Sequence, residues 1–136
     1  MPGLETQRPL ARHQLLADRF EQWVERSPER AAVLAGEVRL TYAELDQRAR
    51  ELAGRLRGAG VEPREIVAIV MPRCWQAVVA ILGALKVGGV FLPIDLSTPA
   101  ERIQTILSSS GARVVIVRAD SDLSFRVSSN LSVIAL

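Results

Sequence analysis

The chain has 136 residues, of which 49% are hydrophobic and 24% charged, and its formal net charge is +2 at pH 7. This size and balance predict one globular domain. No apolar run approaches the ~20 residues that cross a bilayer, and a single cysteine cannot form an internal disulfide. The first residues lack the pattern of a secretory signal, so we expect a cytoplasmic protein. Arginines alternate with acids and aromatic residues make up only 4%, which argues against nucleic-acid binding.

The first predicted element is an amphipathic helix from about His13 to Arg26. The pair Ser27-Pro28 ends it. Two short apolar runs at residues 31–34 and 38–40 then flank Gly36, a pattern that predicts two short strands joined by a tight turn.

The clearest helix signal comes next. Thr41 and Glu44 have the spacing of a capping box, in which the hydroxyl and the carboxylate each accept from the other residue's backbone amide. The helix is expected to stop at Gly58 and Gly60. Apolar residues between these ends recur at steps of three and four, as expected for one helical face: Leu45, Ala49, Leu52, Leu56 and Ala59.

A buried strand, a buried helix and a second strand are predicted after that. Residues Ile66 to Met71 are apolar and mostly β-branched, and Pro72 closes the run. From Arg73 to Lys86 the residues are apolar nearly all round, which indicates a helix packed on several sides. Residues Val90 to Ile94 form the next strand-like run.

Lys86 and the pair Gly88-Gly89 raise the possibility of a phosphate-binding loop. Such loops run from strand through glycines to helix, because the amides that hold the anion are those at a helix N-terminus. Here the glycines follow a helix and precede a strand. We therefore expect Gly88 to end the helix, and Lys86 to complement the negative end of the helix dipole and not to contact a nucleotide.

A further helix is predicted by the same kinds of start and stop residues. Thr98 is expected as an N-cap, with Pro99 at the first helical position and Glu101 three residues after the cap. Gly111 ends this helix, and Val114 to Val117 reads as another strand.

Three repetitions of helix, glycine and short apolar strand predict an α/β fold, a mostly parallel sheet flanked by helices. After Arg118 the signal weakens, and "LSVIAL" at residues 131–136 reads as one more strand with nothing after it to cover it. The pattern thus predicts a truncated architecture.

Ligands of open parallel sheets sit beyond the carboxyl ends of the strands. The segments to examine are therefore Pro72 to Cys74, Asp95 to Thr98 and Arg118 to Ser121. Asp95 is the acid at the end of its strand, and we favour a turn residue that bonds its own backbone over a ligand contact.

The other candidate residues receive structural interpretations. His13, the only histidine, has no serine or cysteine in the sequence placed to pair with it, and a solvated position is favoured over a general base. Cys74 lies beside Trp75 and reads as a small apolar filler. Asp120 and Asp122 are too few acids for a calcium loop. We predict no catalytic, cofactor-binding or metal-binding residue.

Three stretches together resemble the adenylation domains of nonribosomal peptide synthetases, within the adenylate-forming (AMP-binding) enzymes. "LTYAEL" (residues 40–45) resembles the first core motif of that family and "LKVGGVFLPID" (85–95) the second, and "TPAERIQTILSSSGARVVIV" (98–117) resembles the stretch that follows. The resemblance implies a tail over residues 1–12 and, over 13–136, part of an adenylation domain from its N-terminal subdomain only.

The resemblance implies an enzyme that activates an amino acid with ATP as the aminoacyl-adenylate and passes it to a carrier-domain thiol. It also implies that the phosphate loop, the acid that binds the substrate amine, the ribose-binding acid and the adenylation lysine lie beyond this chain. ATP and magnesium are therefore implied only for the complete domain, and this chain alone is expected to be inactive. Its implied partners are the rest of the adenylation domain and the carrier and condensation domains of a synthetase.

Two alternatives remain open. The first alternative is a natural stand-alone module that binds a protein partner or associates with itself through an exposed sheet edge such as "LSVIAL". An unrelated small α/β nucleotide binder is disfavoured, because no strand is followed by a glycine loop that opens a helix.

Overall fold

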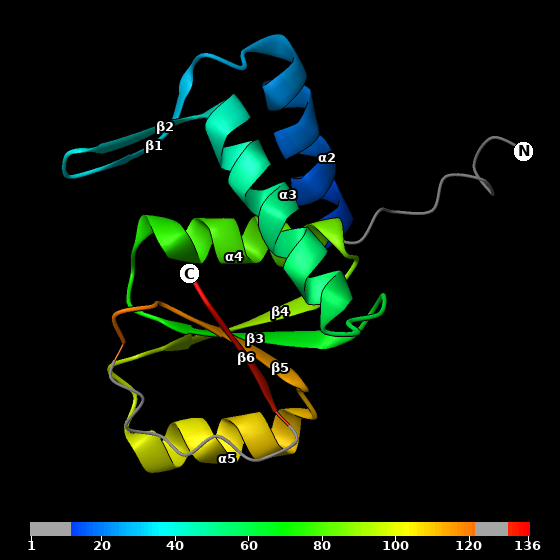
Figure 1. The fold of residues 1–136 in the computed structure, drawn as a ribbon, viewed down its shortest axis with the longest axis vertical. Helices are drawn as coiled ribbons and strands as arrows, with labels where there is room; N and C mark the ends of the chain where they lie inside the picture. Colours follow the sequence, from blue (N-terminus) through cyan, green and yellow to red (C-terminus); the bar gives the residue numbers. More distant parts are fainter. Residues whose placement is uncertain (1–11, 122–130) are drawn as a thin grey trace, which may run out of the picture.

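The computed structural model describes residues 12–121 and 131–136, with side chains from residue 16 onward. A parallel sheet lies between α4 on one side and α5 on the other, with α2 and α3 packed outside α4 (Figure 1). The helices are α2 (Arg12–Arg26), α3 (Tyr42–Gly58), α4 (Trp75–Lys86) and α5 (Ala100–Ser110). The strands are β1 (Ala31–Ala35), β2 (Val38–Thr41), β3 (Ile66–Met71), β4 (Val90–Asp95), β5 (Val114–Val117) and β6 (Ser132–Ala135).

The main sheet has the order β4-β3-β5-β6, and each neighbouring pair is parallel. Every residue of β3 except the first is buried, as is all of β5. Such strands are apolar throughout because helices cover both of their faces. The predicted α/β class and the predicted strand at the end of the chain are confirmed. The first two strands form a separate antiparallel hairpin, as the residues around Gly36 predict.

The capping box at the start of α3 is present. The Thr41 hydroxyl accepts from the Glu44 amide at 3.1 Å, and the Glu44 carboxylate accepts from the Thr41 amide at 3.1 Å. The hydrogen bond from the Thr41 backbone lowers the pKa of Glu44 below its usual value. The box therefore satisfies two amides that a helix start would leave without partners.

Two of the helices end at the glycines predicted from the sequence. Gly88 follows α4 with φ +72°, and Gly111 follows α5 with φ +76°, a left-handed conformation that glycine adopts at no steric cost. Gly89 serves a different need, because a Cβ there would lie 3.2 Å from the Glu65 carbonyl oxygen and 3.3 Å from that of Ala84. The pair is thus a helix end followed by a close backbone approach, as its order in the sequence indicates.

Two helix starts differ from the prediction. The N-cap of α5 is Pro99, not Thr98, and no side chain caps that helix. The reason is that the Thr98 amide donates to the Asp95 carbonyl at 3.0 Å, which holds Thr98 in the preceding turn. The α4 helix begins at Trp75 and not at Arg73, because Cys74 is still extended, with φ −157° and ψ 166°.

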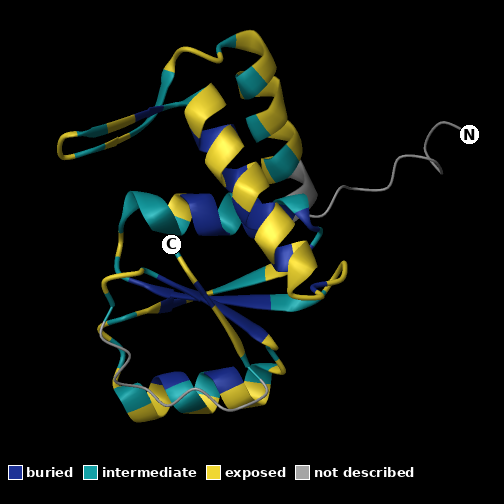
Figure 2. Cartoon of the chain, viewed as in Figure 1, coloured by how far each residue is buried: buried dark blue, intermediate teal, exposed yellow. Residues whose placement is uncertain are grey.

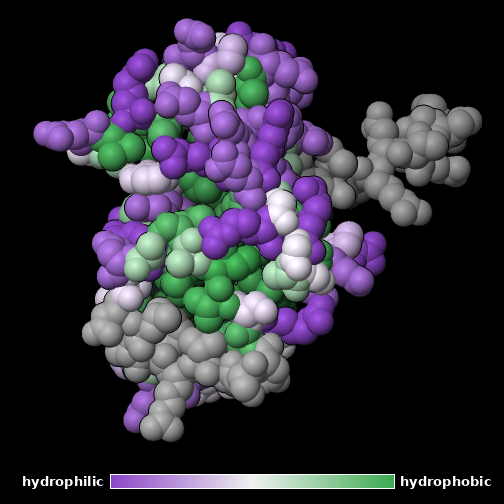
Figure 3. Space-filling view, viewed as in Figure 1, coloured by the Kyte–Doolittle hydropathy of each residue, from purple (hydrophilic) through white to green (hydrophobic). Residues whose placement is uncertain are grey.

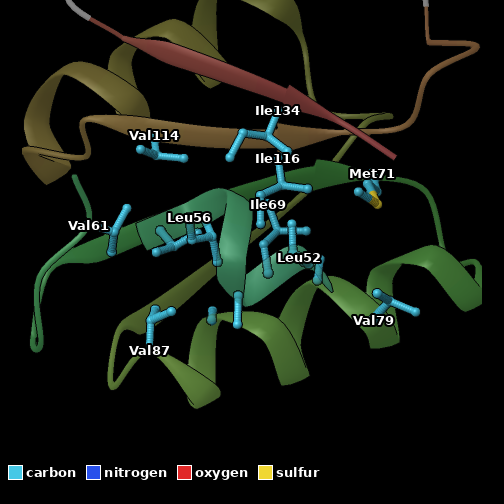
Figure 4. Close-up of a cluster of buried hydrophobic side chains, with 14 of the residues drawn as sticks. Leu52, Leu56, Val61, Ile69, Met71, Val79, Val87, Val114, Ile116 and Ile134 are labelled. Carbon is cyan, nitrogen blue, oxygen red and sulfur yellow. The ribbon is translucent and has the colours of Figure 1, made fainter. Parts of the chain in front are cut away.

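Each face of the sheet has its own cluster of buried side chains, and Figure 2 marks buried positions along the strands and on the helices that cover them. The larger cluster lies under α3 and α4, and Figure 4 shows Leu52 and Leu56 of α3 directed toward the strand residues Ile69 and Ile116. The smaller cluster lies under α5 and includes Ile103 and its neighbours on the opposite face of the sheet. The two clusters together fix the sheet between its helices.

None of the helices described in residues 12–121 and 131–136 is long and apolar enough to span a membrane.

Candidate functional site at the carboxyl end of the sheet

The carboxyl ends of all four parallel strands meet at one edge of the main sheet. Met71 of β3 pairs in register with Asp95 of β4, and Val117 of β5 pairs with both Val70 and Ala135. The three segments chosen from the sequence as ligand-site candidates therefore do follow neighbouring strands. The side chains of these three segments decide whether this edge of the sheet can bind a ligand.

The carboxylate of Asp95 is used within its own turn. Its Oδ1 accepts from the backbone amide of Ser97 at 2.9 Å, and this bond lowers the pKa of Asp95 below its usual value. The interpretation as a turn residue is confirmed. Arg73 also lowers the pKa of Asp95, so the nearest charge stabilises the ionised carboxylate and does not prepare it as a base.

Arg118 and Asp120 form a second local pair. The Nε atom of Arg118 donates to Asp120 Oδ1 at 2.5 Å, and one terminal nitrogen donates to Oδ2 at 3.0 Å. This two-point contact raises the pKa of Arg118 and lowers that of Asp120. Cys74 is half-buried and adds a smaller contribution to the pKa of Arg118.

Lys86 does more than complement a helix dipole. Its Nζ donates to Glu21 Oε1 at 2.7 Å and lies 2.7 Å from Asp46 Oδ1, in an ion pair whose geometry misses that of a hydrogen bond. The same ammonium lies 5.7 Å from the centre of the Phe20 ring. Asp46 also pairs with Arg50 one turn further along α3, at 2.8 Å. Lys86 therefore joins α4 to α2 and α3.

Sequence reasoning missed this ion cluster. The available signal was the position of Asp46, which falls three residues before Ala49 and seven before Ala53 on the buried face of α3. An acid on an apolar helical face requires a buried partner, and the chain has a single lysine, at the end of an otherwise apolar helix. The two facts could have been connected.

The remaining candidates form no site in the described residues. The side chain of His13 and all of Asp122 lie outside the residues that the structure describes. Within the described part, no three histidine, cysteine or acidic side chains come together as metal ligands.

The described helix starts do not fit a nucleotide phosphate. The turn from β3 into α4 is Pro72-Arg73-Cys74, and the approach to α5 ends in Pro99. The described glycines with positive φ lie in the hairpin turn or at the ends of helices: Gly36, Gly60, Gly88 and Gly111. A phosphate cradle needs such residues between a strand and the following helix. The described glycines therefore form no phosphate cradle between a strand and a helix.

A hollow of about 130 Å³ lies between α3 and α4 beside the end of β6. Apolar residues such as Trp75 and Leu136 line it together with charged residues of α3, among them Arg48 and Glu51, and the guanidinium of Arg48 lies 5.1 Å from the Trp75 ring centre. The Oε1 atom of Gln76 is buried there without a hydrogen-bond partner among the described residues. Figure 3 shows hydrophobic side chains gathered across this part of the molecule, below α3. The lining of the hollow is therefore mixed, half apolar and half polar or charged.

A comparison with protein-family models gives the class. The model described as "AMP-binding enzyme" matches residues 20–134. The chain belongs to the family of AMP-binding enzymes.

Curated relatives give the particular branch. Bacitracin synthase 3 of Bacillus licheniformis is 45% identical over 104 residues, which is 76% of this chain and 2% of that protein. Surfactin synthase subunit 2 of Bacillus subtilis (strain 168) is 48% identical over 98 residues, or 72% of this chain and 3% of that protein. The chain thus spans a few hundredths of the length of these synthetases.

Solved structures of nonribosomal peptide synthetases also match this chain. The nonribosomal peptide synthetase FmoA3 matches 88% of this chain with a TM-score of 0.84 and 34% identity, over 13% of its own length. The N-terminal subdomain of Klebsiella oxytoca NpsA matches 88% of this chain with a TM-score of 0.75 and 27% identity, over 31% of its length. The resemblance to the N-terminal part of a nonribosomal peptide synthetase adenylation domain is confirmed, and this chain matches about a third of one such subdomain.

Proposed function

We propose that this chain is a structural part of a nonribosomal peptide synthetase adenylation domain and has no catalytic activity by itself. One observation carries the proposal. The two acids described in the segments that follow β4 and β5, at the edge where a ligand of such a fold would bind, are engaged locally: Asp95 with Ser97, and Asp120 with Arg118. Both carboxylates stabilise local structure and do not face a bound substrate in this proposal.

In this proposal the complete domain uses ATP and magnesium to activate an amino acid, and then transfers it to the thiol of a carrier domain. The residues that hold the nucleotide, the metal and the substrate amine belong to other segments of that domain. The role of the present chain is to form the parallel sheet and its α3–α4 layer, against which those segments pack. Carrier and condensation domains would be its neighbours in a synthetase, and ATP-dependent chemistry would place it in the cytoplasm.

The test is amino-acid-dependent exchange of pyrophosphate into ATP, measured with the purified chain and each of the twenty amino acids. An intact adenylation domain of a related synthetase is the positive control. We expect no exchange above the buffer blank and no binding of ATP in calorimetry. Exchange or saturable ATP binding by the chain alone would overturn the proposal.

A chimera tests the structural role separately. The stretch of an intact related domain that matches residues 20–134 is replaced by these residues, and exchange is measured with that domain's own substrate. We expect activity and unchanged substrate preference. A chimera that folds by circular dichroism but changes its preferred substrate would contradict the claim that this segment carries no substrate-binding residue.

The free edge of β6 favours a second candidate, a module that associates with itself. Within the described residues β6 pairs only with β5, and Val133 on it is 42% exposed. Size-exclusion chromatography with light scattering over a range of concentrations tests this. A dimer that Val133→Lys converts to a monomer would support it, and a monomer at all concentrations would exclude it.

A further inference from the structure

One face of α2 presents two large apolar side chains and two arginines to solvent. Leu16 and Trp23 are 52% and 42% exposed, and Arg19 and Arg26 are exposed as well. Positions 16, 19, 23 and 26 share one helical face because they follow steps of three and four. We call these four residues the α2 stripe. Figure 2 shows much of the outer side of α2 as exposed, and a hollow of about 240 Å³ lies between Arg19, Gln22, Trp23 and Arg26.

The arginines of the α2 stripe have no ion-pair partner among the described residues. Of the acids of α2, Glu21 is held by Lys86, and Asp18 and Glu25 lie beside the arginines, about 100° around the helix from Arg19 and Arg26. Arg30 adds a third cation, with its guanidinium 5.5 Å from the centre of the Trp23 ring. The stripe therefore combines apolar contact area with two arginines that form no ion pair among the described residues.

The exposed tryptophan is fixed in place. The Trp23 ring stacks on Tyr42 of α3 at 5.7 Å between centroids, with an angle of 14° between the planes. A side chain that is already ordered loses little conformational entropy when a partner binds. Tryptophan and arginine are also the residues most often found to dominate the energy of protein interfaces.

We propose that the α2 stripe docks an acidic amphipathic helix of a neighbouring protein domain. Leu16 and Trp23 are seven residues apart, as are Arg19 and Arg26, so the stripe has the repeat of the a and d positions that one helix presents to another. A partner helix with leucine and glutamate alternating at its own a and d positions would place leucine against Leu16 and Trp23 and glutamate against the two arginines. The proposal does not depend on the adenylation chemistry, since α2 lies outside α4 and away from the carboxyl edge of the sheet.

A flat anionic surface fits the stripe less well. Asp18 and Glu25 are also seven residues apart and form an acidic line beside the arginines. This line would repel a phosphate backbone or an anionic lipid layer, whereas a helix can meet it with lysine at flanking positions. The occupant we infer is therefore a helix.

The experiment uses the full chain with Trp75→Phe, which leaves Trp23 as the only tryptophan. The probe is a synthetic peptide of about three heptads with leucine and glutamate alternating at a and d, and its binding is followed by the emission of Trp23 at low salt. We expect a saturable shift, at least about tenfold weaker binding for the peptide with glutamine in place of glutamate, and weakening by added salt.

Charge reversal supplies the decisive control. The double variant Arg19→Glu and Arg26→Glu should no longer bind the glutamate peptide, and it should bind a peptide with lysine in place of glutamate. The matched variant Arg73→Glu and Arg102→Glu changes the same net charge at exposed positions off the stripe, and should still bind the glutamate peptide.

Four results would overturn the proposal: no saturable shift for the glutamate peptide, equal binding of the glutamine peptide, equal loss in the matched variant, or tighter binding of phosphatidylglycerol vesicles or single-stranded DNA than of the peptide. Circular dichroism melting of each variant shows that the fold is retained, since both replaced pairs are exposed.

Discussion

The two faces of the parallel sheet are closed in different ways. On one face α3 and α4 pack together over the larger cluster, with Leu52 of α3 seated against Gly83 of α4. That side also contains the Lys86–Asp46 ion pair and the capping box of α3. On the other face α5 is the one described helix that covers the smaller cluster around Ile103, and it has no side-chain cap. The α3–α4 side is therefore held by specific pairs of residues as well as by apolar packing. The α5 side depends on the packing of apolar residues that recur at helical spacing.

The largest expected effect compares one core residue from each face. Leu52 and Ile103 are both 1% exposed. We expect Leu52→Ala to lower the free energy of unfolding by about 4 kcal/mol and Ile103→Ala by about 3 kcal/mol, because the site between two packed helices is less able to collapse. Urea unfolding measures both. A larger loss for Ile103→Ala would reverse the comparison.

The ion cluster comes next. Asp46 has a side chain only 5% exposed, and that of Lys86 is 14% exposed. Asp46→Ala leaves the Lys86 ammonium without its buried partner, and we expect a loss of about 3 kcal/mol in unfolding free energy. The double variant Asp46→Leu and Lys86→Met removes both charges and should recover most of this loss. If the double variant is as unstable as the sum of the two single variants, the pair is not coupled as described.

A double-mutant cycle sharpens the account of the α3–α4 contact. A Cβ at Gly83 would lie 2.6 Å from Leu52 Cδ2, so Gly83→Ala alone should cost about 2 kcal/mol through overpacking. In the Leu52→Ala background that atom is absent. The same change should then be neutral or stabilising by up to about 1 kcal/mol, because alanine favours a helix over glycine. Equal effects in both backgrounds would show that the helices are not in this contact.

The smallest effect is a dependence on pH at the start of α3. The folded state lowers the pKa of Glu44 below 4.5 through the hydrogen bond from the Thr41 backbone. The stabilisation is therefore complete above the unfolded pKa and is lost as the pH falls through the lower, folded pKa. We expect the stability difference between the natural chain and Glu44→Gln to be constant near neutral pH and to change below pH 4.5. A stability difference that stays constant as the pH falls below 4.5 would contradict this account of the box.

Most of the fold could be predicted from the sequence because its elements have strong local signals. The Thr41–Glu44 box, the glycines at 88 and 111 and the apolar strand at 66–71 each act within a few residues, and all three are confirmed. The predicted N-cap of α5 was wrong, because the Thr98 amide donates to the Asp95 carbonyl and Thr98 therefore belongs to the preceding turn. The Lys86 cluster was missed because its partners are 40 and 65 residues away in the chain, a separation that periodicity does not report.

The candidate site was predicted only in outline. The order of helix, glycine and strand correctly excluded a phosphate cradle at Gly88-Gly89, and the sheet topology placed the carboxyl-end segments at one edge. The local pair between Arg118 and Asp120 depends on side-chain geometry that the sequence does not contain. The α2 stripe was not recognised, because the helical pattern shows which residues share a face but not which of them remain exposed.

The most direct test of the central claim is the mass of the native gene product, measured in the source cells with an antibody against this segment. A structural part of a synthetase should appear in a polypeptide several times heavier than the 14.9 kDa of this chain. A product of 14.9 kDa, with no heavier form, would contradict the claim and show that the chain acts as a separate protein.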